Sequence, residues 1–345
     1  MFRKHALPLG RLLEATSAIQ RLLRRDANHE PANDPAPGRV FDAEFSTVEE
    51  ASPKARQPAG KPGQFVSGSF GNQAGTRPYK LYIPTSYAGQ PLPLIVMLHG
   101  CTQSPDDFAA GTRMNALAEE SGCFVLYPAQ TAAANHSRCW NWFKRGDQQR
   151  DKGEPAILAG MTRQCMRRYA IDPRRVYVAG LSAGGAMAAV LAANYPDLYA
   201  AVGVHSGLAV GSAHDVQSAF AAMQGKPAAK SAARKAASRS IPVIVIHGDR
   251  DTTVHPRNGE QVIRESLDAG AASSVERGQM PGGHAYTRAV QRDSSGRVVL
   301  EHWLVHGAGH AWSGGSPAGS YTDPKGPDAA QAMLRFFLQT ADAMR

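Results

Sequence analysis

Short apolar runs recur along the chain from about residue 79 to its end, separated by longer segments of mixed polarity. Most of these runs are rich in Val, Ile and Leu and stop at Gly or a polar residue, a pattern typical of strands buried in a parallel sheet. Strands are predicted over 79–83, 94–98, 124–127, 175–179, 201–204, 242–246 and 299–305, and helices near 112–121, 155–169, 184–194, 258–269 and 327–340. This alternation predicts an α/β domain built on a doubly wound, mostly parallel sheet.

The first 63 residues follow a different pattern and are predicted to precede this domain, which we place at 64–345. Leucines and an isoleucine recur at helical spacing within residues 1–25, with arginines between them, so an amphipathic helix is predicted there. Such a helix needs an apolar partner. We expect it to dock on the domain or to form a homo-oligomer with a second subunit, and contact with a membrane surface is the alternative. Residues 26–63 are rich in Pro, Ala and Gly and predict a disordered linker.

The same N-terminal segment bears on cellular location. Arg11, Glu14 and Arg21 interrupt its apolar face, whereas a secretory signal needs an unbroken apolar core. We therefore expect no secretory signal peptide, and on this ground a cytoplasmic protein. No run in the sequence approaches the roughly 18 apolar residues of a membrane-spanning helix, so no transmembrane segment is predicted.

The strand predicted to end at Ala179 leads directly into Gly180-Leu181-Ser182-Ala183-Gly184. A G-x-S-x-G sequence after a strand and before small residues is typical of a nucleophile elbow, the sharp turn that lifts a serine hydroxyl clear of the sheet. Glycines flank the serine because bulky neighbours would block that turn. The motif alone is weak, since roughly 0.2 matches are expected by chance in a chain of this length. It gains weight if an acid and a base follow in the order that the fold requires.

Both partners follow in that order. The apolar run over 241–246 ends in His-Gly and delivers Asp249 and Asp251 to the edge of the sheet where open α/β sheets place their chemistry. A later apolar run leads to His310. The order Ser, Asp, His is expected of the α/β-hydrolase fold, with Ser182 as nucleophile, His310 as general base and an aspartate that orients the imidazole.

Two aspartates and three histidines compete for these roles. Asp251 lies beyond the end of its strand, where its side chain can turn toward the histidine, and Asp249 is expected to cap the loop backbone instead. His302, His306 and His310 fall at i, i+4 and i+8, which on a helix would form a metal-binding face. The β-branched and aromatic residues before His306 and the glycines after it disfavour a helix. No metal is therefore predicted, and His310 is the expected base.

The early apolar run over 94–98 ends in His99-Gly100-Cys101. In α/β-hydrolases one backbone N–H that stabilises the developing oxyanion follows the nucleophile, and another comes from the loop after this early strand. The N–H groups of Ala183 and Cys101 are therefore predicted to form the oxyanion hole. The alternative is that His-Gly merely ends a core strand.

Several longer motifs surround these positions. They are Leu98-His99-Gly100-Cys101-Thr102-Gln103, Ser137-Arg138-Cys139-Trp140-Asn141-Trp142-Phe143, Gly180-Leu181-Ser182-Ala183-Gly184-Gly185, His247-Gly248-Asp249-Arg250-Asp251 and Gly309-His310-Ala311-Trp312. Together, over roughly residues 64–340, the chain resembles the poly(3-hydroxybutyrate) depolymerase family of esterases, which includes feruloyl- and acetylxylan-type esterases. The resemblance implies a triad of Ser182, Asp251 and His310 and ester hydrolysis through an acyl-enzyme, without a metal or organic cofactor. It also implies a secreted protein, in contrast to the location predicted above.

The expected substrates are hydroxyalkanoate oligomers or a polyester. A feruloyl- or acetylxylan-type ester is the alternative. An amide or peptide hydrolase acting on an acidic polymer also stays open, because the triad does not define the leaving group. A non-catalytic binding protein is disfavoured because all three triad residues are present.

Three tryptophans, Trp140, Trp142 and Trp312, lie close in sequence to the expected site loops. Their flat apolar faces suit an aliphatic polyester chain or an aromatic acyl group, so all three are predicted to bind substrate. Packing in the hydrophobic core is the alternative for each. Trp312, two residues after the expected base, is the preferred candidate for the pocket wall.

The chain carries a formal net charge of +9, and part of it is concentrated in a basic insertion over 209–240. The insertion precedes the strand expected to carry the aspartate, a place where insertions often cover an active site. A solvated helical excursion is the alternative. No aromatic residue lies among its lysines, so nucleic-acid binding is not expected, and an anionic substrate attracted by the positive field fits better.

Four cysteines allow three complete pairings if they are oxidised. Cys101 and Cys139 each lie beside an expected active-site loop, and a bridge between them would hold the two loops together. Cys123 and Cys165 are expected to be buried thiols. A cytoplasmic location would argue against any disulfide, so both states of the Cys101 and Cys139 pair stay open.

Overall fold

The computed structural model describes residues 63–226, 241–266 and 272–342. The predicted N-terminal helix over 1–25 and the linker over 26–63, except for its last residue, lie outside the described residues. So do residues 227–240 of the basic insertion. The predictions made for these segments, including a homo-oligomer formed through the helix, stay predictions.

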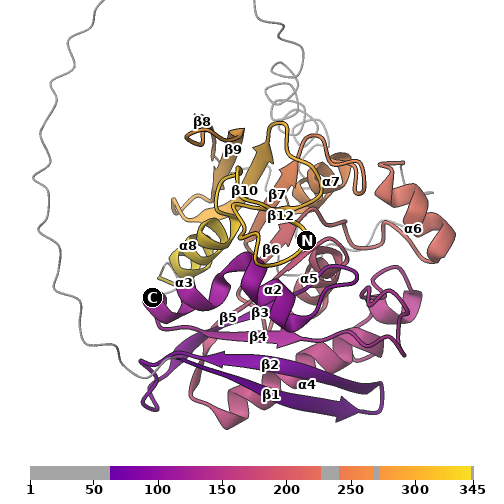
Figure 1. The fold of residues 1–345 in the computed structure, drawn as a ribbon, viewed down its shortest axis with the longest axis vertical. Helices are drawn as coiled ribbons and strands as arrows, with labels where there is room; N and C mark the ends of the chain where they lie inside the picture. Colours follow the sequence, from indigo (N-terminus) through magenta and orange to yellow (C-terminus); the bar gives the residue numbers. More distant parts are fainter. Residues whose placement is uncertain (1–62, 227–240, 267–271, 343–345) are drawn as a thin grey trace, which may run out of the picture. The chain divides into compact units, whose positions relative to one another are not determined.

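Ten strands form one sheet in the order β1-β2-β4-β3-β5-β6-β7-β10-β9-β8 (Figure 1). They are β1 (Gln64–Asn72), β2 (Gly75–Ile83), β3 (Leu92–Leu98), β4 (Phe124–Pro128), β5 (Ile171–Leu181), β6 (Ala201–His205), β7 (Val243–Gly248), β8 (Ala272–Gln279), β9 (Ala285–Arg292) and β10 (Val298–Val305). Neighbours from β4 to β10 pair in parallel, and antiparallel pairs extend both edges. The predicted mostly parallel sheet is confirmed.

Helices cover both faces of this sheet (Figure 1). They are α2 (Pro105–Thr112), α3 (Met114–Ser121), α4 (Gly153–Arg168), α5 (Ala183–Asn194), α6 (Val216–Met223), α7 (Arg257–Ser266), α8 (Ala329–Asp342) and the short 3-10 helix η1 (Arg145–Gln148). Leu94 and Val96 of β3 belong to a core shared with α4 and α5, and Ile95 and Met97 to a second core shared with α2, α3 and α8. Central strands buried on both faces appear in the sequence as continuous apolar runs. The doubly wound α/β-hydrolase fold is confirmed.

The edge strands β1 and β8, and β9 next to β8, are absent from the predicted set. β1 alternates exposed and partly buried residues and contains Gly and Ser, and β8 exposes most of its side chains. An edge strand buries little surface, so its residues need not form an apolar run. Helices α2 and α6 are also absent from the predicted set. Their caps are visible instead: Ser104 accepts from the N–H of Asp107, and Asp215 from that of Ser218.

The topology brings distant segments to one edge of the sheet. The parallel strands β3, β5, β7 and β10 end there, so the segments that follow Leu98, Leu181, Gly248 and Val305 gather at the same edge. A two-stranded parallel pair, β11 (Trp312–Ser313) with β12 (Thr322–Asp323), fixes the chain beyond β10. Every residue predicted for the triad and the oxyanion hole lies in or next to these segments.

Candidate active site

The predicted nucleophile occupies a strained turn between β5 and α5. Ser182 has φ 57° and ψ −119°, a conformation that residues with a side chain rarely adopt. The flanking glycines provide the room it needs. A Cβ atom on Gly180 would lie 2.7 Å from the carbonyl oxygen of Leu98, and one on Gly184 would lie 2.6 Å from that of His99. Close packing of the turn against the end of β3 therefore requires the glycines of the G-x-S-x-G sequence.

A hydrogen bond joins the loop after β7 to the loop after β10. Nδ1–H of His310 donates to Oδ2 of Asp251 at 2.7 Å. The other carboxylate oxygen accepts the backbone N–H groups of Thr253 (2.9 Å) and Val254 (2.8 Å). Burial alone would raise the pKa of Asp251, but the hydrogen bonds from His247 and His310 lower this pKa well below the usual value of an aspartate. The carboxylate is therefore ionised at neutral pH, and it leaves Nε2 of His310 as the nitrogen available to act as a base.

His247, at the end of β7, contributes to the same carboxylate site. Its side chain is fully buried, and Nε2–H donates to the carbonyl oxygen of Val254 at 2.7 Å and lies 3.3 Å from Oδ2 of Asp251. It thereby links Asp251 to the strand that precedes it. This role is not predicted from the sequence. The signal that could reveal it is a histidine at the end of an otherwise apolar run.

His205, at the end of β6, links the nucleophile turn to the segment after His310. Its carbonyl oxygen accepts the N–H of Ser182 at 2.9 Å, and its Nε2 accepts the N–H of Ser313 at 3.0 Å. The ring also stacks on Trp312, with centroids 5.0 Å apart. Burial, reinforced by the charges of nearby histidines, lowers the pKa of His205 to about 3, so its ring is neutral at neutral pH. Sequence reasoning missed this residue, whose signal is again a histidine that ends an apolar strand.

A second aspartate–histidine pair involves the competing aspartate. Oδ2 of Asp249 lies 3.0 Å from Nδ1 of His306, and its Oδ1 accepts the N–H of Gly307 at 2.7 Å. Nε2 of His306 in turn lies 2.8 Å from the hydroxyl oxygen of Thr287. Asp249 is thus occupied in holding the loop backbone. The structure brings Asp251, and not Asp249, to His310.

Ser182 and His310 form no direct hydrogen bond with each other in the part of the chain that the structure describes. In unliganded active sites the bond between nucleophile and base is often long and shortens when substrate binds. The side chain of His310 is 13% exposed, so it can be reached from solvent.

Two backbone N–H groups at this edge are free to receive an anion. The N–H groups on either side of Cys101, those of Gly100 and Thr102, both donate to protein acceptors, 2.9 and 2.7 Å away. The N–H of Cys101 itself has no acceptor among the described residues, nor has that of Ala183, where α5 begins. The first N–H of a helix also carries the positive end of the helix dipole. An oxyanion hole needs unpaired donors of this kind near the nucleophile, for which Ser182 is the candidate.

A sequence model of the esterase PHB depolymerase family matches residues 77–275, more than half of the chain. The chain belongs to this family. The matched range includes Ser182 and Asp251, and His310 lies beyond it. Family membership confirms the resemblance carried by the sequence motifs.

Two depolymerases are similar to this esterase-family chain. Poly(3-hydroxyalkanoate) depolymerase C from Paucimonas lemoignei is 31% identical over 252 residues, which span 70% of this chain and 60% of that protein. Poly(3-hydroxybutyrate) depolymerase from Ralstonia pickettii is 30% identical, over 65% of this chain and 48% of that protein. The chain therefore spans less than two thirds of the length of either depolymerase.

An esterase whose name gives a different substrate matches over more of its own length. Feruloyl esterase B from Thermothelomyces thermophilus is 27% identical over 70% of this chain and 86% of that protein. The solved structure of acetyl xylan esterase from Aspergillus awamori superposes with a TM-score of 0.61, over 81% of this chain and 100% of that one, at 20% identity. This structural likeness supports the fold alone.

The three tryptophans predicted to bind substrate are buried in this family member. Trp140 and Trp312 expose 0% and 1% of their surface, and Trp142 exposes 6%. The indole N–H of Trp140 donates to the carbonyl oxygen of His99, and Trp312 stacks on His205. This burial fits the alternative weighed for each residue, packing in the hydrophobic core. Contact between these tryptophans and a substrate stays a prediction.

The four cysteines form one disulfide and two free thiols. Cys101 and Cys139 form a disulfide, which joins the segment after β3 to the loop that carries the buried Trp140. Cys123 and Cys165 are buried thiols, and burial raises the pKa of both to about 12. Both side chains are therefore protonated at neutral pH.

The three histidines of the possible metal-binding face lie in separate environments. His302 is buried in β10, His306 pairs with Asp249, and His310 pairs with Asp251. Within residues 63–226, 241–266 and 272–342, no group of three His, Cys, Asp or Glu side chains is arranged to hold a metal ion. The helices of these same ranges include none that is long and apolar enough to cross a membrane.

Proposed function

We propose that the chain is a serine-dependent carboxylic ester hydrolase that works through an acyl-enzyme. The observation that carries the proposal is the 2.7 Å hydrogen bond between buried Asp251 and His310, at the same sheet edge as the strained turn of Ser182. An ionised carboxylate on Nδ1 keeps the imidazole in the tautomer whose Nε2 accepts a proton. Membership of an esterase family supports a carboxylic ester as the bond that is cleaved.

The proposed reaction has two half-reactions. Oγ of Ser182 attacks the ester carbonyl carbon while Nε2 of His310 takes the hydroxyl proton. The carbonyl oxygen becomes an oxyanion and accepts the N–H groups of Cys101 and Ala183. The C–O bond to the alcohol then breaks, and His310 protonates the leaving oxygen. Water attacks the acyl-enzyme by the same steps, which releases the carboxylic acid and regenerates Ser182, and Asp251 stabilises the imidazolium each time it forms.

The proposed substrates are hydroxyalkanoate oligomers or the corresponding polyester. Two relatives with depolymerase names, at 31% and 30% identity, support this substrate class. The lengths of the alignments favour a second candidate, a feruloyl or acetylxylan ester. The match spans 86% of feruloyl esterase B and 73% of a probable acetylxylan esterase A from Aspergillus clavatus, against 60% and 48% of the depolymerases.

A substrate panel with a nucleophile variant tests the proposal. The full chain and Ser182→Ala are assayed with p-nitrophenyl acetate, methyl ferulate, a 3-hydroxybutyrate trimer and the p-nitroanilide of acetate. We expect ester cleavage by the natural sequence, a loss on the order of 10⁴-fold in kcat for Ser182→Ala, and no cleavage of the anilide. The preferred ester then distinguishes the two substrate classes.

Two outcomes would overturn the proposal. One is a Ser182→Ala variant that keeps about a tenth of the wild-type kcat, far above the residual rate left when a nucleophile is removed. The other is faster cleavage of the anilide than of the acetate ester. Faster cleavage of the anilide would favour an amide or peptide hydrolase, the alternative that the sequence leaves open.

We also infer that the enzyme works in an oxidising compartment. The Cys101–Cys139 disulfide supports this inference, because disulfides are rare in the reducing cytoplasm. It opposes the cytoplasmic location predicted from the N-terminal segment, which lies outside the described residues. Mass spectrometry of alkylated, unreduced protein taken from its native cells should find the two cysteines bridged. Alkylation of both would contradict the inference.

A further inference from the structure

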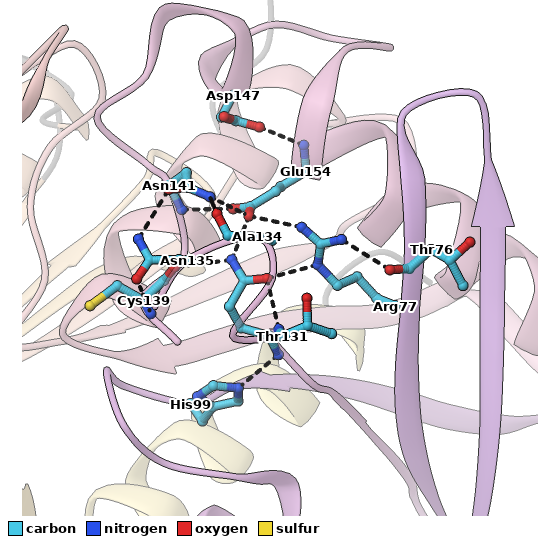
Figure 2. Close-up of polar contacts among 11 residues, drawn as sticks. Thr76, Arg77, His99, Thr131, Ala134, Asn135, Cys139, Asn141, Asp147 and Glu154 are labelled. Atoms are coloured by element: carbon cyan, nitrogen blue, oxygen red, sulfur yellow. Dashed lines mark hydrogen bonds and ion pairs between the residues drawn. The ribbon is translucent and has the colours of Figure 1, made fainter. Parts of the chain in front are cut away.

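A buried polar network contacts the loop that follows β4, and none of its members takes part in the reaction steps above (Figure 2). Its centre is Glu154, 3% exposed, in the first turn of α4. Oε1 of Glu154 accepts Nδ2–H of Asn141 at 2.8 Å, Nη2–H of Arg77 at 3.2 Å and a short hydrogen bond from Gln130. Oε2 accepts the backbone N–H of Asn141 at 2.7 Å. Three donors thus reach Oε1 and one reaches Oε2, and these hydrogen bonds hold the carboxylate in place.

Gln130 carries this network to the end of β3. Its Oε1 accepts Nε–H of Arg77 at 2.7 Å, and its Nε2–H donates to the carbonyl oxygen of Cys139 at 3.0 Å. The backbone N–H of Gln130 donates to Nε2 of His99 at 3.1 Å. Because that nitrogen accepts, Nδ1 of His99 carries the hydrogen and donates to the carbonyl oxygen of Gly100 at 2.7 Å. Burial lowers the pKa of His99 to about 4, so the neutral ring keeps this arrangement at neutral pH.

The loop over 129–143 is also attached directly to residues 99–102, the segment with the proposed oxyanion donor. The attachments are the Cys101–Cys139 disulfide, the N–H of Thr102 donated to the carbonyl oxygen of Ser137 at 2.7 Å, and Nε1–H of Trp140 donated to the carbonyl oxygen of His99 at 3.2 Å. β3 ends at Leu98, so the ladder of the sheet does not extend to Cys101. The loop therefore helps to hold the N–H of Cys101 in place, together with the hydrogen bond from the N–H of Gly100 to Gln103.

We propose that Glu154 is a positioning residue for the oxyanion hole. It acts through Asn141 and Gln130, which hold the loop over 129–143 and, through that loop, the N–H of Cys101. The inference rests on the proposed function, because that N–H is the group it positions. The proposal also explains the sequence Cys-Trp-Asn-Trp-Phe at 139–143. Its Cys139 and Asn141 connect residues 99–102 to the network around Glu154. A displacement of about 1 Å in such a donor is enough to lower the rate of the chemical step.

Glu154→Gln is the decisive variant. The amide keeps the size of the side chain and one acceptor oxygen, but its NH₂ group faces hydrogen-bond donors in place of the other oxygen. Glu301→Gln is the matched control, because Glu301 is fully buried in β10 and accepts guanidinium groups of Arg288 and Arg335 at 2.9 and 2.7 Å. Both variants lose a buried charged acceptor, so both should lower the melting temperature.

Only Glu154→Gln should change catalysis. We expect kcat for p-nitrophenyl acetate to fall about 10- to 100-fold, less than when an oxyanion donor is removed outright, with KM within about 3-fold of wild type. An alkyl trifluoromethyl ketone, which adds to Ser182 and forms an oxyanion, should bind more weakly by the same factor as kcat falls. Binding of acetate, the product, should stay unchanged, which a general loosening of the site would not allow.

A Glu154→Gln enzyme with wild-type kcat, or an equal fall of kcat in Glu301→Gln, would overturn the inference. If Glu154→Gln does not fold, Asn141→Ala replaces it. This change removes the side-chain hydrogen bonds of Asn141 to Glu154, Ala134 and Asn135 and leaves the buried Glu154–Arg77 ion pair intact. Ser182→Ala separates the two proposals. Activity retained in Ser182→Ala refutes the proposed function and with it this inference, whereas an inactive Ser182→Ala beside an unaffected Glu154→Gln refutes the positioning role alone.

Discussion

Replacing Asp251 by Asn should nearly abolish turnover while the fold persists. The Asn side chain can keep its oxygen toward the N–H groups of Thr253 and Val254. Its NH₂ group then takes the place of Oδ2, which lies 2.7 Å from Nδ1 of His310. Two donors cannot face each other, so the imidazole moves its proton to Nε2 or turns away. Either change leaves Ser182 without a base.

The size of the loss follows from that change of tautomer. An orienting aspartate replaced by Asn lowers kcat on the order of 10⁴-fold in a serine triad, which corresponds to about 5.5 kcal/mol of transition-state stabilisation. KM should change far less, because Asp251 is buried and contacts no substrate. Steady-state kinetics with p-nitrophenyl acetate measures both constants, and thermal unfolding verifies that the variant is folded at the assay temperature.

Asp249→Asn is the matched control, two residues away. Its oxygen can still accept the N–H of Gly307, and its NH₂ group can donate to Nδ1 of His306. His306 then carries its proton on Nε2 and donates to the hydroxyl oxygen of Thr287, 2.8 Å away. The hydrogen bond between residues 249 and 306 is kept, with donor and acceptor exchanged. We therefore expect kcat to fall less than about 10-fold. Similar losses of kcat in the two variants would refute the assignment of Asp251 as the orienting acid.

Three further changes test other parts of the structure. Gly184→Ala should cost about 3 kcal/mol of stability in urea unfolding, because its Cβ would lie 2.6 Å from the carbonyl oxygen of His99; unchanged stability would refute the packing of the elbow. Reduction of the Cys101–Cys139 disulfide by dithiothreitol should lower kcat more than it changes KM, and a fully reduced enzyme with wild-type kcat would contradict the anchoring of Cys101. His302→Gln should make the free energy of unfolding depend less steeply on pH below about pH 6.5. Burial lowers the pKa of His302 from 6.5 to about 4, so between these values the unfolded chain binds a proton that the folded protein does not. As pH falls through this window, the free energy of unfolding of the wild type should therefore fall more steeply than that of the variant. The difference in slope should be up to about 1.4 kcal/mol per pH unit. Parallel curves for the two proteins would exclude this role of His302.

The features that can be predicted from the sequence are those that require a particular residue type at a particular position. The glycines at 180 and 184 are required by the backbone atoms they touch, so the elbow is visible as a local motif. The central strands are buried on both faces, so their residues form continuous apolar runs. The order of Ser182, Asp251 and His310 follows from the order of the strands that carry them. These features depend on local sequence or on chain order, and both can be read without knowing the packing.

Other features depend on packing between distant segments, which the sequence does not display. A tryptophan beside a motif residue looks the same whether it faces a substrate or the core, and the burial of Trp312 depends on Phe108 and His205. The contacts of His205 and the donors around Glu154 likewise come from segments far apart in the chain. Exposed edge strands such as β8 leave no apolar pattern, because their stability comes from the partner strand.

Trapping the acyl-enzyme tests most directly whether Ser182 is the nucleophile of an ester hydrolase. The enzyme is mixed with excess p-nitrophenyl butyrate, quenched in acid before the first turnover is complete, and digested for mass spectrometry. The predicted result is a burst of p-nitrophenol equal to the enzyme concentration and one butyryl group on the peptide that contains Ser182, both lost in Ser182→Ala. A butyryl group on another residue, or a full burst in Ser182→Ala, would contradict it.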